Sequence, residues 1–152
     1  MRSGRKIKLT GGVYMVTFLT GHKGSGKTKK LIERVHEAVE ASNGNVVCIE
    51  KGDTLTYDVD HKARLVNIED YGIKGFDAFY GFIAGMCAGN YDITDILVDS
   101  TLKIGGKDMD ELAKFIEKVN PLAQQTNINF TFSVSADNDE IPASLNDIVT
   151  KL

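Results

Sequence analysis

The sequence has no tryptophan, only two prolines and only two cysteines among its 152 residues. Cys48 and Cys87 lie in apolar segments, and neither has a cysteine or histidine partner at metal-ligand spacing. We therefore expect buried free thiols rather than a disulfide framework or a zinc site. No apolar stretch approaches the roughly 18 residues that span a bilayer, and residues 1–20 lack a signal-peptide core. These shortages predict a cytoplasmic protein without a membrane span.

The chain also lacks a dominant charge. Its 18 basic and 21 acidic residues give a net charge of −3, so no overall field attracts nucleic acid or an anionic membrane. Its composition, 42% hydrophobic and 26% charged, is that of one globular domain. The length leaves room for one sheet with helices on both sides.

What the sequence does contain is a phosphate-binding motif. Residues 21–28 read G-x-x-x-x-G-K-T, follow the apolar run of residues 16–19 and precede a helical pattern. Glycines let the backbone amides of such a loop point into one concavity, and the helix that follows adds its positive dipole end. The residues predicted to bind the nucleotide are Gly21, His22, Lys23, Gly24, Ser25, Gly26, Lys27 and Thr28.

The motif assigns chemistry to individual positions. Lys27 reaches the β and γ phosphates, the Thr28 hydroxyl ligates Mg²⁺, and Ser25 and Gly26 offer mainly backbone donors. We therefore predict that the chain binds a nucleoside triphosphate with Mg²⁺. An incidental glycine-rich turn is the alternative.

Residues 1–14 differ from the rest, because they are basic and contain the pair Gly11-Gly12 just before Met15. Three interpretations stay open: a disordered basic arm, an additional edge strand at residues 7–10, or an extension upstream of a natural start at Met15. Residues 15–152 are predicted to form a single nucleotide-binding domain.

The remaining pattern alternates between strands and helices. Short apolar runs at 46–49, 63–68, 93–99 and 128–134 predict strands, and helical spacing predicts helices at 30–42, 108–121 and from Pro142 onward. This order predicts an α/β fold of three layers, with a mainly parallel β-sheet flanked by helices. Residues 76–88 are apolar on nearly every side, which favours a buried helix; a homo-oligomer interface is the alternative.

Asp99 directly follows the apolar run of residues 96–98. That position brings its carboxylate to the carboxyl end of the sheet, beside the phosphate-binding loop. Magnesium prefers hard oxygen ligands, so Thr28 and Asp99 are the expected metal ligands. A turn acid in solvent is the alternative.

Together, residues 21–28 and 96–99 resemble the two nucleotide-binding motifs of a small P-loop NTPase, and the strand and helix order of residues 15–135 agrees. Many P-loop ATPases place a glutamate directly after the magnesium aspartate, whereas this chain has Ser100. The RecA-like branch offers another location for the catalytic base, at the end of the strand after the P-loop helix. Here that residue is Glu50, provided that its strand lies next to the strand of residues 16–19; a carboxylate in solvent is the alternative.

The resemblance also implies a polar residue that senses the γ phosphate, and Ser133 or Ser135 stands at the matching strand end. Residues 103–107 are expected to form a flexible loop near Asp99. Arg64 is the arginine best suited to reach a neighbouring site in an oligomer.

The leading functional hypothesis is a slow ATPase, with Lys27 and Glu50 catalytic, coupled to a partner or to self-assembly. Adenine is favoured because the chain lacks the N-K-x-D and D-x-x-G motifs of GTPases. A nucleoside or nucleotide kinase, or a nucleotide-responsive binding module without turnover, are the alternatives.

Overall fold

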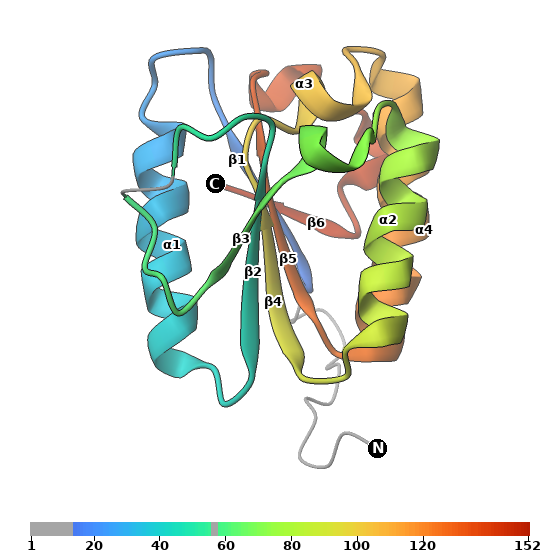
Figure 1. Ribbon diagram of the computed structural model, residues 1–152. Helices are drawn as coiled ribbons and strands as arrows, with labels where there is room; N and C mark the ends of the chain where they lie inside the picture. The colour runs from blue at the N-terminus through green and yellow to red at the C-terminus, as the bar shows by residue number, and fades with distance from the viewer. Residues whose placement is uncertain (1–13, 56–57) are drawn as a thin grey trace.

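The computed structural model describes residues 14–55 and 58–152. The basic segment of residues 1–13, with the three interpretations given for it, lies outside the described residues. The described chain forms one six-stranded sheet with helices on both faces (Figure 1). The predicted α/β class with a parallel, helix-flanked sheet is confirmed.

All pairings in the sheet are parallel, and the strand order is β3-β2-β4-β5-β1-β6. The strands are β1 (Val16–Thr20), β2 (Asn45–Glu50), β3 (Arg64–Asn67), β4 (Ile93–Val98), β5 (Asn129–Val134) and β6 (Val149–Lys151). Because the strands run in one direction, the segments that follow them meet at the carboxyl edge of the sheet. The glycine-rich loop and Asp99 both lie at that edge.

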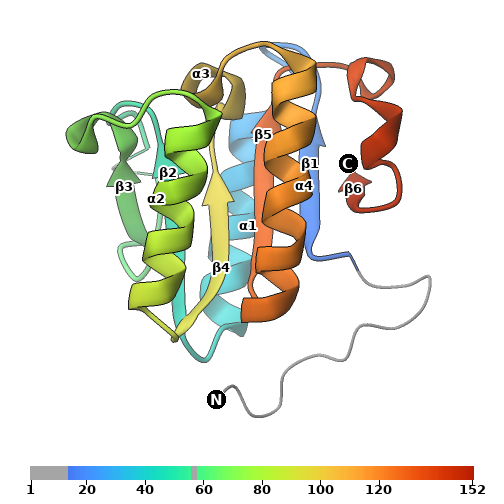
Figure 2. The same ribbon diagram turned by 90° about the vertical axis from the view of Figure 1, so that its right-hand side faces the viewer.

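The helices divide between the two faces of the sheet (Figures 1 and 2). Helix α1 (Lys27–Ala41) covers one face, whereas α2 (Phe76–Gly89) and α4 (Met109–Thr126) pack against each other on the other. A short helix, α3 (Thr101–Gly105), follows β4 at the carboxyl edge. Asp108 caps α4 by accepting hydrogen bonds from the amides of Asp110 and Glu111, and the helix continues through Pro121.

Two apolar cores result from this arrangement. The larger lies between the sheet and the α2/α4 face and includes a ring contact between Phe79 and Phe115, with centroids 5.3 Å apart. The smaller joins α1 to the sheet through Leu31 and Val35, which are fully buried. Cys48 and Cys87 are buried and form no disulfide, as predicted, and burial raises the pKa of Cys48 to about 12.

The end of the chain departs from the prediction. Instead of a helix from Pro142, a single 3-10 turn (Ala143–Leu145) leads into β6, which pairs with β1. The helical spacing was misleading because Val149 is buried by its place at the sheet edge rather than on a helix face. Pairing continues past β6, since the amide of Leu152 donates to the Phe18 carbonyl at 2.9 Å.

Residues 103–107 also differ from the expected flexible loop. Helix α3 includes Lys103, Ile104 and Gly105. Ile104 is buried in the larger core, and that apolar contact fixes the segment as a helical turn. Among the described residues, no helix is long and apolar enough to cross a membrane.

Helix α2 has one buried side and one partly open side. Phe76, Phe79, Ile83 and Cys87 are buried within the chain, whereas Phe82 and Met86 are only partly covered. The preference for a buried helix over residues 76–88 therefore holds for one side of α2 and not for the other.

Candidate functional site

The glycine-rich loop connects β1 to α1, and its shape depends on glycine. Gly21, Gly24 and Gly26 have φ angles of 136°, 88° and 89°, a region that other residues rarely adopt. A Cβ atom on Gly21 would lie 2.5 Å from the Ser25 hydroxyl oxygen. Gly21 is therefore favoured mainly by its backbone conformation, because the exposed Ser25 hydroxyl could rotate away from an added Cβ.

Several backbone amides of the loop lie close together in the sequence and have no hydrogen-bond acceptor among the described residues. The Gly21 amide donates to the Ala136 carbonyl at 2.8 Å, and the Ser25 amide donates to the His22 carbonyl at 3.1 Å. Within the described residues, the amides of Gly24, Gly26 and Thr28 have no acceptor. They lie at the N-terminus of a 15-residue helix, so the helix dipole adds to their preference for an anion.

Lys27 is the first residue of α1 and is only 9% exposed. Its ammonium donates to the His22 carbonyl at 2.9 Å, which holds the side chain across the loop. Burial lowers the pKa of Lys27, and the nearby Asp99 carboxylate partly opposes that shift. The cation of the loop and the acid after β4 are thus within electrostatic reach of each other.

Asp99 follows β4 and is 8% exposed. Its Oδ1 accepts a hydrogen bond from the Ser133 hydroxyl at 3.3 Å, and its Oδ2 accepts one from the Ser100 hydroxyl at 3.1 Å. The Ser100 amide in turn donates to the Ser133 hydroxyl at 2.8 Å. This small network orients the carboxylate from two neighbouring strands.

Ser100 itself has a left-handed backbone, with φ 54° and ψ 54°. Such a conformation costs a non-glycine residue about 1–2 kcal/mol, and its hydrogen bonds with Ser133 and Asp99 offset part of that cost. Ser100 therefore connects Asp99 with β5.

Magnesium suits the oxygen atoms available at this edge. Thr28 has an exposed hydroxyl in the first turn of α1, and each Asp99 oxygen accepts only one hydrogen bond from the described residues. A hydroxyl and a carboxylate are ligands that Mg²⁺ accepts while retaining several waters. The residues present fit that ion.

Glu50 lies at the end of β2. The expectation that this strand lies next to β1 is wrong. Two strands, β4 and β5, separate β2 from β1, because the chain crosses from α1 to the far side of the sheet. Glu50 instead lies beside the end of β4, where Ile49 pairs with Val98. Glu50 is therefore close enough to Asp99 to feel its charge, and it does not lie on a strand next to the glycine-rich loop.

The Glu50 side chain is buried, with 1% of the residue exposed. Its Oε1 accepts hydrogen bonds from the Thr54 amide at 3.0 Å, the Thr54 hydroxyl at 3.1 Å and the Leu55 amide at 3.2 Å. Burial raises the pKa of Glu50, these hydrogen bonds oppose the shift, and Asp99 adds to it. The alternative of a carboxylate in solvent is therefore wrong as well.

The connections of the sheet diverge between β2 and β4. The chain leaves β2 toward β3 on one side, whereas it leaves β4 toward β5 on the other. Ligands of open parallel sheets bind where the strand order diverges in this way, outside the carboxyl ends of the strands. Glu50 and Asp99 stand on the two sides of that divergence.

The remaining predicted site residues do not all lie together. Ser133 is buried and contacts Asp99, whereas Ser135 is exposed and points out of this network. Arg64 is the first residue of β3, at the amino edge of the sheet, so it lies at the opposite end from the glycine-rich loop of its own chain.

Sequence reasoning missed one contact. His22 Nε2 lies 2.8 Å from Asp137 Oδ2, which connects the glycine-rich loop to the segment after β5, and Glu140 lies nearby. The motif accepts almost any residue at position 22, so only the fold could reveal this pair. All three side chains are exposed.

Comparisons with known proteins identify no family for this chain: no protein-family model and no curated protein matches it.

Proposed function

We propose that this chain is a Mg-ATP-binding P-loop protein of the RecA-like type and that it hydrolyses ATP slowly, coupled to a partner or to self-assembly. The observation that carries the proposal is the meeting of the glycine-rich loop, the buried Lys27 and Asp99 at one edge of the sheet. Donors without an acceptor, a cation and a carboxylate are the groups that a magnesium-bound triphosphate needs.

In this proposal the loop amides and Lys27 bind the phosphates and neutralise charge that develops on them. Thr28 and Asp99 would hold Mg²⁺, and the bound ion would supply positive charge that offsets the charge on the phosphates. Ser133 keeps Asp99 oriented through its hydroxyl, which is how a change at the γ phosphate would reach β5. Adenine is proposed because the base-reading motifs of GTPases are absent from the sequence.

Glu50 is the proposed general base. Its raised pKa increases its basicity, which favours proton abstraction near neutral pH. From the residues that the structure describes, its Oε2 accepts one hydrogen bond, 3.3 Å from the Leu55 amide, which leaves a lone pair for a water. Glu50→Gln should leave ATP binding intact and lower turnover by roughly 10². An unchanged rate of phosphate release would remove Glu50 from the mechanism.

A second candidate is a nucleotide-responsive binding module that never turns over. It is favoured by Ser100 at the position after Asp99 and by the hydrogen bonds that already hold Glu50 Oε1. One assay separates the candidates: the protein is incubated with [γ-³²P]ATP, Mg²⁺ and a panel of nucleosides. Free phosphate supports the ATPase, labelled nucleotide would instead support a kinase, and binding without either supports the module.

Self-assembly is proposed through the outer side of α2, where Ala78 and Ala88 are exposed. Light scattering with and without Mg-ATP tests it. A mass that stays at 16.6 kDa in both conditions would contradict it.

A further inference from the structure

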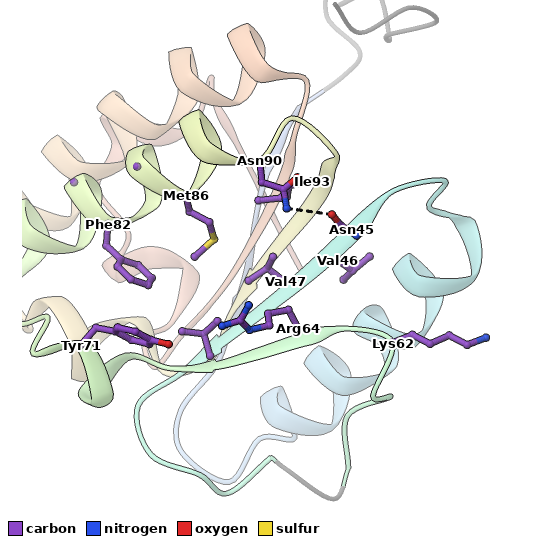
Figure 3. A pocket seen from close by; sticks show the side chains of 13 residues that line it. Asn45, Val46, Val47, Lys62, Arg64, Tyr71, Phe82, Met86, Asn90 and Ile93 are labelled. Atoms are coloured by element: carbon purple, nitrogen blue, oxygen red, sulfur yellow. Dashed lines mark hydrogen bonds between the residues drawn. The ribbon is translucent and has the colours of Figure 1, made fainter.

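A cavity of about 690 Å³ lies on the α2 side of the sheet, away from the glycine-rich loop (Figure 3). Its floor is formed by β2 and the edge strand β3, and one wall is formed by α2. Asn45 and Ile93 mark its position near the amino ends of β2 and β4. It is therefore separate from the edge that carries Lys27 and Asp99.

The cavity exists because two features leave space beside α2. The connection from β2 to β3 packs on the α1 face through Leu55, Val59 and Ala63, so it does not cover β3 on the α2 face. Gly81 and Gly85, one turn apart, line the wall without side chains, and a Cβ on either would meet no atom within 4 Å.

The lining is mainly apolar but has a polar side. Val47, Val66, Phe82 and Met86 supply aliphatic, aromatic and thioether surface. The Tyr71 and Phe82 rings, with centroids 5.6 Å apart, form one aromatic wall. Such a surface with few polar groups, and a volume within the range of about 300–1,000 Å³, is typical of small-molecule sites.

The charge of the lining has one sign. The Arg64 side chain extends over the floor toward Tyr71, whereas the Lys62 side chain points away from the cavity (Figure 3). In the described part of the chain no acidic side chain lines the cavity, and no carboxylate pairs with Arg64. An unpaired guanidinium against apolar surface has the geometry to bind a carboxylate with two hydrogen bonds.

From this combination we propose that the cavity binds an amphipathic organic anion, namely a carboxylate with an aliphatic or aromatic body. The carboxylate pairs with Arg64, and the apolar body lies between α2 and the β2/β3 floor. The side-chain amides of Asn90 and Asn45, joined by a hydrogen bond of 3.1 Å, bound the far end of the cavity. The site is independent of the proposed nucleotide site.

The test uses decanoate as the probe and decanol as its uncharged counterpart, both below their aggregation limits, with calorimetric titration of the full chain. We expect saturable decanoate binding at one site per chain and at least tenfold weaker binding of decanol. Equal affinity for the two compounds, or no binding of decanoate, would overturn the proposal.

Two variants and their controls locate the site. Arg64→Met should lower decanoate affinity about tenfold or more, whereas Lys62→Met removes the same charge from a side chain that points away and should change affinity less than twofold. Gly85→Leu should fill the wall and abolish binding, with circular dichroism confirming an intact fold, whereas Gly89→Leu, outside the cavity, should not. Binding that survives both Arg64→Met and Gly85→Leu would refute the assignment.

Lys27→Ala should bind decanoate like the unaltered chain, so failure of the nucleotide proposal and failure of this one are distinguishable. Sedimentation of the ligand-free chain supplies the remaining check. A dimer that decanoate does not dissociate and that Gly85→Leu disrupts would identify a second copy of the chain as the occupant, which would contradict the proposal.

Discussion

Glu50 is a buried carboxylate that pairs with no cation among the described residues. Its negative charge can therefore be removed by protonation but is not balanced by an ion pair. Three hydrogen bonds to Oε1 retain the side chain, yet burial still raises its pKa above the ordinary 4.5. The folded state favours the neutral form of such a group. The free energy of unfolding is therefore lower at any pH at which the unfolded chain has released the proton. The residue therefore reduces stability at neutral pH, which is common at positions retained for chemistry.

That cost predicts a pH dependence. At pH values below 4.5, Glu50 is protonated in both the folded and the unfolded chain. Its ionisation then takes nothing from the free energy of unfolding. As the pH rises above 4.5 the unfolded chain ionises first, so the free energy of unfolding falls until the folded pKa is passed. Glu50→Gln lacks this titration, and its stability relative to the unaltered chain should increase over that window. Urea denaturation at a series of pH values measures the difference; a constant difference would show that the Glu50 pKa is the same in both states.

Lys27 is the residue on which nucleotide binding should depend most. Lys27→Ala removes the buried ammonium that the loop holds beside Asp99, and we expect tight triphosphate binding to be lost. Lys30→Ala is the matched control, because Lys30 is an exposed lysine in the same helix turn and should bind Mg-ATP normally. Equilibrium binding of a fluorescent ATP analogue compares the two, and micromolar affinity retained by Lys27→Ala would contradict the role given to the loop.

At the scale of elements, the contact between α3 and α2 is tight enough to predict the effect of one methyl group. A Cβ on Gly105 would lie 2.2 Å from the Phe76 ring, in a core where the ring cannot withdraw freely. Gly105→Ala should therefore lower the free energy of unfolding by about 1–3 kcal/mol.

Gly89→Ala provides the comparison for that prediction, because its Cβ meets no atom within 4 Å and the position is helical. It should raise stability by about 0.4–1 kcal/mol by restricting the unfolded chain. Both values come from chemical denaturation. Equal stability of the two variants would mean that Phe76 moves aside at no cost.

The elements that sequence reasoning located well are those with a strong local signal. Apolar runs such as residues 96–98 identified buried parallel strands, and helical spacing from residue 108 identified α4. The C-terminal segment failed because four apolar residues at helical spacing fit equally well in a strand that pairs with a distant β1. Local periodicity carries no information about such a partner.

At the scale of the molecule, binding of a ligand to the folded state alone should stabilise the whole chain. At a Mg-ATP concentration about 100 times its dissociation constant, the gain is about 2.7 kcal/mol, which corresponds to a rise in Tm of roughly 5–11 °C for a chain of this size. Differential scanning fluorimetry with Mg-ATP measures it. The shift should disappear with Lys27→Ala, and a shift of the same size in that variant would indicate binding elsewhere.

The candidate site could be predicted from the sequence only as far as its local parts. The loop and Asp99 were found because each follows an apolar strand, and parallel strands bring their ends to one edge. The surroundings of Glu50 could not be found, because they depend on which strands are neighbours: β2 lies beside β4 and two strands away from β1. Strand order is set by packing across the whole sheet.

The neighbours of β1 also determine when the site comes into being. This first strand pairs with β5 and β6, so Val16 meets Phe130 and Val149, each more than a hundred residues later in the chain. During synthesis, the glycine-rich loop leaves the ribosome early, yet the strand that supports it has no partner until β5 has followed. Such distant pairing is slow to form. A chain halted before β5 therefore carries the glycine-rich motif in its sequence without the sheet that supports the loop.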